Sequence, residues 1–445
     1  MSRYRVHLFV ILGVCALLLY LYGAIEHLNH VNTSLKASDQ QSYLRYARKL
    51  ATEEGFLGGR NRMPLYPLLQ SFFYEEGMSD EVFFIQARLV NVILSLIVLL
   101  LLYPIVRRYL DALTSACLVL VTAFTVFLFK AGYVQAEILF YMLNFGCFVL
   151  MGRMLRAPTW KSGLLTGLLL GLAHLTKASI LPGLALFVLL YAVRHVLGAL
   201  RVLRGDSTAY RQRLAIVTLV MALLTFLATV FPYIRNSYLR FGRPFYNVNS
   251  TFYMWYDSWE EVKAGTRAHG DRKGWPDMPP EEIPSPARYF REHTAKQVLD
   301  RIINGLKTLA FYCTHTYGYH KYVLLYLLFA VGIAWGNRAG ARRLLRENLW
   351  LTLFLACYFA GYLVLYAWYV PIAGPGDRFI LGQFLPFMFA LSYGITRLSW
   401  PQPLLSWGRV RLSSLRLFHI ATLALLLPDI YVILTQRIYQ VYGGS

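Results

Sequence analysis

Long apolar runs recur along this chain at intervals, separated by short polar connections. About twenty apolar residues, rising about 1.5 Å each as a helix, cover the hydrocarbon core of a bilayer. The pattern therefore predicts an all-α polytopic membrane protein with about eleven spans. Their approximate ranges are 6–24, 82–106, 112–129, 136–151, 163–175, 180–197, 214–233, 322–335, 349–369, 379–395 and 417–434.

The first run resembles the core of a signal peptide, because Arg3 and Arg5 precede it. No small-residue cleavage site follows it, and polar residues such as His27 come next. We therefore predict an uncleaved membrane span at this end of the chain.

Composition agrees with a bilayer as the solvent, since 57% of the residues are hydrophobic and only 15% are charged. The net charge of +21 would suggest nucleic acid in a soluble protein, so the placement of the basic residues decides its meaning. With a cytoplasmic N-terminus, alternation of the spans puts every basic cluster on the cytoplasmic side, which is the positive-inside pattern. The net charge therefore indicates topology and not nucleic-acid binding. The clusters are Arg107/Arg108, Arg153/Arg156/Lys161, 194–213, 338–346 and 397–416.

Two connections on the opposite side are long, 25–81 and about 235–319. Both are polar but rich in aromatic residues, which is typical of helices that lie at the membrane surface. In the first loop, Ser38 or Asp39 is expected to cap a helix with an apolar face, and Pro64 is expected to begin a second short helix. A basic, glycine-rich turn joins the two.

Two carboxylates on this non-cytoplasmic side are candidate catalytic groups. Asp39, at the membrane surface, could act as a general base for a hydroxyl acceptor, although the same residue could simply cap its helix. Glu137 begins a later span on the same side, where it could join Asp39 or be solvated or paired with Lys130.

Basic residues on the same side are candidate phosphate ligands. Arg60 and Arg62 lie in the glycine-rich turn, and guanidinium groups bind phosphate bidentately; attraction to anionic lipid is the alternative. His174 and Lys177 interrupt two apolar runs, where ionisable groups are expensive unless they are functional, although Lys177 could also snorkel.

Arg235 and Arg378 follow or begin spans at outer turns, where each could be a ligand or an interfacial anchor. In the second long loop, Trp259 and Trp275 are candidates for a platform that binds a sugar or an acceptor, because aromatic faces suit pyranose rings. The five cysteines lie in or beside apolar runs without paired spacing, so no zinc site or disulfide framework is predicted.

Several of these segments together resemble a known family. An Asp after the first span, Tyr43, Gly55 and a basic residue directly before the segment 63–69 (Met-Pro-Leu-Tyr-Pro-Leu-Leu) resemble the protein O-mannosyltransferases and their bacterial relatives, including lipid A aminoarabinose transferases. The segments 136–140, 167–177 and 232–236 resemble later stretches of the same family in order, side and spacing.

The resemblance implies a GT-C glycosyltransferase that transfers a sugar from a polyprenyl-phosphate donor and inverts its anomeric carbon. It implies that Asp39 and Glu137 are the family's two acidic residues, that Arg62 contacts the donor phosphate, and that Arg378 matches a late arginine. Asn61 stands where relatives with a metal in this loop carry an acidic residue. No metal ligand is therefore assigned, and a divalent cation stays an open alternative.

The resemblance covers roughly the first 245 residues. We therefore expect a catalytic membrane module at 1–245 and a variable module at 246–445 that holds the second loop and the last four spans. The acceptor is expected to be a lipid, a glycan or a protein, and the location a bacterial inner membrane with the site on its periplasmic or extracellular face. The alternative function is a secondary transporter or a lipid-linked-sugar flippase, and a non-catalytic membrane scaffold is a further rival.

Overall fold

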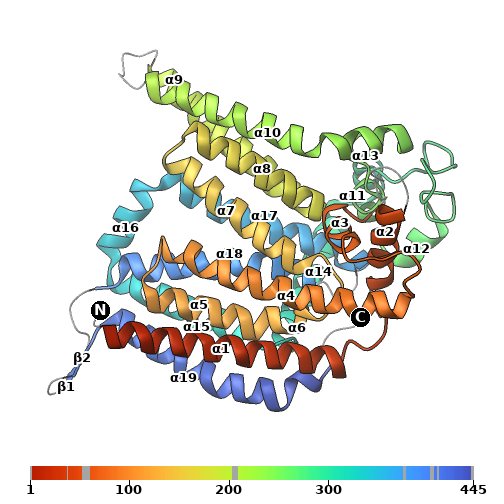
Figure 1. Cartoon of the computed structure of the whole chain (residues 1–445). Helices are drawn as coiled ribbons and strands as arrows, with labels where there is room; N and C mark the ends of the chain where they lie inside the picture. The colour runs from red at the N-terminus through yellow and green to blue at the C-terminus, as the bar shows by residue number, and fades with distance from the viewer. Residues whose placement is uncertain are drawn as a thin grey trace.

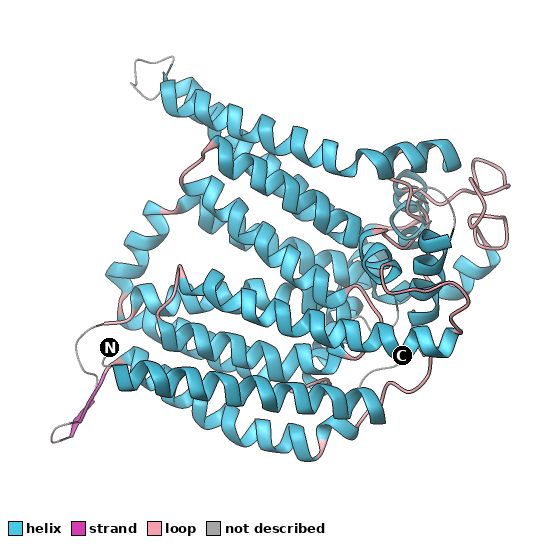
Figure 2. Cartoon of the chain, in the orientation of Figure 1, coloured by secondary structure: helices cyan, strands magenta, loops and turns pink. Residues whose placement is uncertain are grey.

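The computed structural model of the chain describes residues 3–37, 39–52, 61–202, 209–373, 377–400, 405–407 and 410–441. The regular secondary structure of this described part is helical except for one short antiparallel hairpin, in which Leu405 pairs with Leu412 (Figure 2). The hairpin consists of β1 (Leu405–Trp407) and β2 (Val410–Leu412). The predicted all-α class is confirmed.

Long helices lie side by side and form the body of the molecule (Figure 1). They are α1 (Arg3–His30), α4 (Asp80–Arg107), α5 (Ala112–Thr122) with η1 (Ala123–Phe127) and α6 (Leu128–Ala131), α7 (Glu137–Arg156), α8 (Trp160–Thr176), α9 (Leu181–Val202), α10 (Ala209–Phe241), α14 (Ala295–His315), α15 (His320–Gly336), α17 (Leu349–Ala373), α18 (Asp377–Leu398) and α19 (Ser414–Thr435).

Eight stretches in the described residues are long and apolar enough to cross a membrane, and a bent pair raises the number to nine. The bent pair is α14 and α15, which meet at 103°. Of the predicted spans, 163–175 and 322–335 form helices of 17 residues, and α18 is not among the eight. The chain is thus a multi-pass membrane protein, but the count of eleven spans is not confirmed.

The short elements gather at the two ends of the bundle (Figure 1). The N-terminus, α16 (Arg338–Glu347) and the hairpin lie at one end, which we call the basic end. The two long loops fold at the other, which we call the site end. Their elements are α2 (Gln40–Thr52), α3 (Leu65–Ser71), α11 (Val248–Thr251), η3 (Tyr253–Trp255), α12 (Trp259–Ala264) and α13 (Pro286–Glu292); η2 (Ala178–Ile180) and η4 (Arg437–Tyr439) complete the elements.

Burial differs strongly among the helices. In the stretch Ala112–Ala131, 72% of the most apolar window is buried, against 17% for His7–His30. The stretch Ala112–Ala131 therefore lies in the centre of the bundle. The apolar side chains that α1 exposes, such as Ile11 and Leu18, suit contact with lipid. The central helix also contains a π-helical turn, Ala123–Phe127.

Three glycines allow α8 to approach α10 closely. They recur every fourth residue, so they lie on one face of α8. A Cβ on Gly163 would lie 2.3 Å from the Thr218 carbonyl oxygen, one on Gly167 would lie 2.2 Å from that of Ala222, and one on Gly171 would lie 2.6 Å from the Thr229 side chain. Small residues at this spacing allow the backbones of membrane helices to pack closely.

We expect Gly167→Val to destabilise the protein by about 1 to 3 kcal/mol, because the added side chain must push α10 away. Thermal unfolding in detergent micelles measures this loss. Gly13→Val is the matched control, because a Cβ at Gly13 meets no atom within 4 Å. Equal melting of both variants would show that the close approach of α8 and α10 does not contribute to stability.

Candidate active site

A pair of buried amides fixes the start of the first external segment. Asn32 and Gln40 donate to each other's side-chain oxygens at 2.8 and 2.7 Å, and both side chains are almost fully buried. Asn32 also donates to the Gly132 carbonyl at 2.7 Å, and the Val134 backbone N–H donates to Gln40 Oε1 at 2.9 Å. The pair therefore ties the segment after α1 and the first residue of α2 to the turn that precedes α7.

An apolar cluster joins the same elements below this amide pair. It includes Tyr43 and Leu44 of α2, Tyr66 of α3, Phe84 of α4 and Val134 of the turn before α7. The rings of Tyr43 and Tyr66 meet edge to face, with centroids 5.3 Å apart. Four segments thus share one small core at the site end, and Glu137 directly follows its member Ala136.

Two ion pairs involve the predicted catalytic and phosphate-binding residues. The Asp39 carboxylate pairs with the Arg62 guanidinium, and their side chains are 27% and 19% exposed. Glu137 Oε1 and Lys177 Nζ lie 3.1 Å apart, with side chains 5% and 18% exposed. Removing one partner of such a poorly hydrated pair leaves an uncompensated charge, which costs about 3 to 5 kcal/mol when the pair is fully buried.

Tyr43 and Tyr66 connect these two pairs. The Arg62 guanidinium carbon lies 5.2 Å from the centroid of the Tyr43 ring, a cation–π distance. Burial raises the pKa of Tyr66 well above its ordinary value; the Gln70 hydrogen bond opposes this, and the nearby Tyr43 and Glu137 add to it. Tyr66 therefore stays neutral. Sequence reasoning missed this residue, although it lies within the quoted 63–69 segment.

The remaining candidates of the catalytic module occupy different positions. His174 is buried among the rings of Phe226, Tyr233 and Phe245, and neither of its ring nitrogens has a hydrogen-bond partner among the described residues. Arg235 is exposed on the last turns of α10. These two residues have no contact with either ion pair in the part of the chain that the structure describes.

Arg60 lies outside the described residues. Arg378 belongs to the first turn of α18, but its side chain is also outside the described part.

The two predicted aromatic platform residues pack inside the second external segment. Trp259 lies edge to face on Tyr253, and Trp275 packs on Phe252 with centroids 5.0 Å apart. Neither lines the cavity of about 520 Å³ in this segment. Its aromatic walls are instead Trp255, Tyr256 and Tyr289, and its polar lining includes Asp257, Glu261, His269, Arg288 and His293.

One wall of this cavity is a charged cluster centred on Asp257. Its carboxylate accepts hydrogen bonds from Tyr289 Oη at 2.7 Å and Arg301 Nη1 at 2.9 Å. His293 Nε2 lies 2.7 Å from the same carboxylate, and His293 Nδ1 lies 2.9 Å from the Tyr289 carbonyl oxygen. Because both ring nitrogens face oxygen acceptors, both must carry hydrogen, so His293 is an imidazolium.

The pKa values in this cluster shift accordingly. Burial disfavours the charged form of Asp257, but hydrogen bonds from Tyr289 and His293, with the charges of His293 and Arg301, outweigh it and lower the Asp257 pKa. Burial likewise opposes the charge on His293, but its bonds to Tyr289 and Asp257 raise its pKa. Sequence analysis did not predict that these residues form a cluster, because Arg301 lies on α14, 44 residues after Asp257.

Within the described residues, no group of three or more His, Cys, Asp or Glu side chains is arranged to hold a metal ion. The polar groups that converge at the site end are instead carboxylates and cations already arranged as pairs. Such a site can accept a proton at a carboxylate and hold an anion at the guanidinium or ammonium group.

Comparison with known proteins finds a family match for one part of the chain, and this part contains several of the site residues. Residues 62–230 match a family described as dolichyl-phosphate-mannose-protein mannosyltransferase. This segment is therefore similar to the GT-C mannosyltransferases. The predicted resemblance is thus confirmed over a stretch that contains Arg62, Glu137, His174 and Lys177, while Asp39 and Arg378 fall outside it.

One solved structure also resembles this chain. The crystal structure of ArnT from Cupriavidus metallidurans bound to undecaprenyl phosphate aligns with 93% of this chain and 84% of its own, at 15% identity and a TM-score of 0.33. A search of curated proteins finds no significant match.

The Asp257 cluster predicts a pH window for the stability of the second external segment. Asp257 stabilises the fold above its unfolded-state pKa of about 3.9, and this contribution is lost as the pH falls through its lowered folded-state pKa. His293 stabilises it below its unfolded-state pKa of about 6.5, and this contribution is lost as the pH rises through its raised folded-state pKa. Protection of the second external segment from protease should therefore be greatest between about pH 4 and 6.5.

The His293→Gln variant is the control, because glutamine does not titrate in this range. Its protection should be lower at pH 6 and should not fall further between pH 6 and 8. A wild-type protein whose protection is equally flat over that interval would contradict the charged state assigned to His293.

Proposed function

We propose that this protein is an inverting membrane glycosyltransferase that moves a sugar from a polyprenyl-phosphate-linked donor to an acceptor at the non-cytoplasmic face. The single observation that carries the proposal is the pairing of Asp39 with Arg62, which Tyr43 and Tyr66 connect to the pair of Glu137 and Lys177. The family description, which names a dolichyl-phosphate sugar, supports a donor of this chemical class.

Asp39 is proposed as the general base. It removes the proton from the acceptor nucleophile, which attacks the anomeric carbon while polyprenyl phosphate leaves from the opposite face. In the structure, Arg62 pairs with Oδ1 of the carboxylate and therefore competes with the acceptor for that oxygen. The donor phosphate is a natural competitor for Arg62, because it offers several strongly accepting oxygens.

Arg62 is proposed to stabilise the leaving phosphate. Its Nε–H is buried and has no hydrogen-bond partner in the described part of the chain, so one donor of the fork is available to a ligand. Negative charge on the leaving oxygen grows in the transition state, where a fixed donor lowers the barrier. Lys177, and by family resemblance Arg60 and Arg378, are proposed as further cations around this phosphate.

Glu137 is proposed to hold Lys177 in place for this role. It is the first residue of α7, where the partial positive charge of the helix N-terminus favours a carboxylate. Its ion pair orients the Lys177 ammonium, which extends from the junction of α8 and η2. Glu137 therefore supports the electrostatic part of the reaction, while Asp39 performs the proton transfer.

A divalent cation does not fit the residues around Asp39. The carboxylate already faces the guanidinium of Arg62. The residue directly before Arg62 is the neutral Asn61, which adds no negative charge. A cation placed there would be repelled by Arg62. The proposed mechanism therefore places positive charge on arginine and lysine side chains.

The acceptor is proposed to bind at the second external segment, within the variable module at 246–445. The cavity of about 520 Å³ combines aromatic rings with carboxylates and imidazoles, which suits a hydroxylated acceptor. Trp259 and Trp275 support its neighbouring core. By the distribution of basic clusters, this segment and the site face the periplasm of a bacterial inner membrane.

The Asp39→Asn variant should fold and bind donor lipid but lose at least a hundredfold in transfer rate, because the amide cannot accept the proton. Transfer of labelled sugar from donor lipid to acceptor measures the rate. Glu76→Gln, which removes an exposed carboxylate of the same segment, should leave it unchanged. Transfer by Asp39→Asn within tenfold of wild type would exclude Asp39 as the base, and translocation of donor lipid without transfer would favour the flippase alternative.

The Arg62→Ala variant should bind donor lipid more weakly and reduce the turnover number by about a hundredfold or more, which corresponds to about 2.7 to 4 kcal/mol for one transition-state donor. Arg45→Ala is the matched control, since Arg45 is an exposed arginine of α2. Lipid binding measured in detergent, beside single-turnover kinetics, separates the two effects. If Arg62→Ala left both the lipid affinity and the turnover number unchanged, Arg62 would be an interfacial anchor only.

A further inference from the structure

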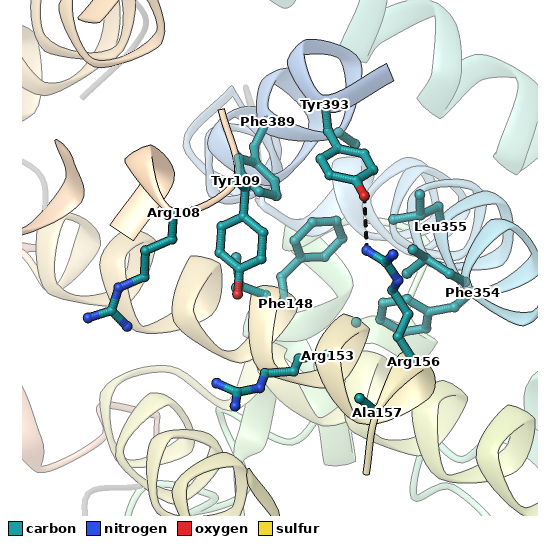
Figure 3. Close-up of a pocket in the computed structure, with 14 residues that line it drawn as sticks. Arg108, Tyr109, Phe148, Arg153, Arg156, Ala157, Phe354, Leu355, Phe389 and Tyr393 are labelled. Carbon is teal, nitrogen blue, oxygen red and sulfur yellow. Dashed lines mark hydrogen bonds between the residues drawn. The ribbon is translucent and has the colours of Figure 1, made fainter. Parts of the chain in front are cut away.

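A cavity of about 440 Å³ lies at the basic end of the bundle, far along the helices from the proposed active site. It opens between the ends of α4, α7, α17 and α18 (Figure 3). Its polar side chains include the arginines Arg108, Arg153 and Arg156, and none of the described residues that line it is a carboxylate. The reaction proposed above makes no use of this cavity.

Aromatic side chains form the walls of the cavity. Phe148 and Phe354 lie with ring centroids 6.1 Å apart, and Tyr109 meets Phe389 edge to face at 5.6 Å. Small residues leave the space open, among them Ala390. Because these walls lie within the helical bundle, they suit an acyl chain better than a small hydrated ion.

The arginines border this apolar space and have unused hydrogen-bonding capacity. Arg156 Nη1 donates to the Tyr393 hydroxyl at 2.9 Å, a bond that holds the guanidinium at the rim (Figure 3). Arg108 and Arg153 are exposed and make no ion pair with any residue that the structure describes. Three positive charges around an apolar cavity are complementary to an anion that carries a hydrocarbon chain.

We propose that this cavity binds one anionic phospholipid of the leaflet at the basic end. Its phosphate lies between Arg108 and Arg153, and one acyl chain lies along Phe148 and Phe354. The positive-inside pattern assigns this leaflet to the cytoplasmic side. Basic pockets between membrane helices on that side are suited to anionic headgroups.

Ordinary attraction of basic loops to an anionic surface is the competing explanation. It depends on net charge and not on the cavity, so any pair of arginines at the same end would contribute equally. Arg342 and Arg343 of α16 provide this comparison, because they lie at the basic end but do not line the cavity.

Native mass spectrometry of the full chain, titrated with phosphatidylglycerol or phosphatidylcholine in detergent, measures the binding. We expect phosphatidylglycerol to bind more tightly, and Arg108→Gln/Arg153→Gln to weaken it about 25-fold, from about fivefold for each arginine. The Arg342→Gln/Arg343→Gln control, of equal net charge, should change the affinity less than twofold. Equal losses in both double variants would overturn the proposal.

A variant that fills the cavity but keeps the arginines tests the role of the apolar walls. Ala390→Phe should weaken phosphatidylglycerol binding at least tenfold, since the ring would occupy the space of the acyl chain. Glycerol phosphate, which has the headgroup charge without chains, should fail to compete at millimolar concentration. Full affinity in Ala390→Phe, or effective competition by glycerol phosphate, would show that charge alone binds the lipid and would overturn the proposal.

Discussion

The reciprocal amide pair of Asn32 and Gln40 is the constraint on which the site end depends. An amide buried without partners is costly, so these two side chains fix each other, and through them the Gly132 and Val134 backbone. Gln40 follows Asp39 directly, and Val134 lies three residues before Glu137. A single buried polar contact therefore sets the positions of two carboxylates that are 98 residues apart.

Stability alone does not account for the ion pairs around this constraint. Pairs removed from water gain little net free energy, because desolvation offsets the Coulomb attraction. A hydrophobic core of the size formed by Tyr43, Tyr66 and Phe84 could join the same helices without Arg62 or Lys177 nearby. These charges make physical sense as groups held ready for an anionic ligand, with carboxylates as temporary partners.

Apolar run lengths and basic clusters were enough to predict the helical class, the division into two ends, and the shared side of Asp39 and Glu137. They did not predict the full extent of α8 and α15, whose 17 residues exceed the predicted spans 163–175 and 322–335, since hydropathy alone does not locate where a helix ends. The sequence patterns also did not predict a role for Tyr66 or the cluster of Asp257, His293 and Arg301. Their roles depend on contacts between distant segments, which leave no periodic pattern in the sequence.

The Asp39–Arg62 pair gives the proposed reaction an order of events. While the donor is absent, the guanidinium pairs with Oδ1 of the carboxylate and competes with an acceptor or water for that oxygen. When the donor phosphate attracts Arg62, one movement places positive charge at the leaving group and frees the carboxylate oxygens for the nucleophile's proton. Both groups then become competent together and only when donor is present, which limits hydrolysis. The Tyr43 ring beside Arg62 is the surface along which this short movement can occur.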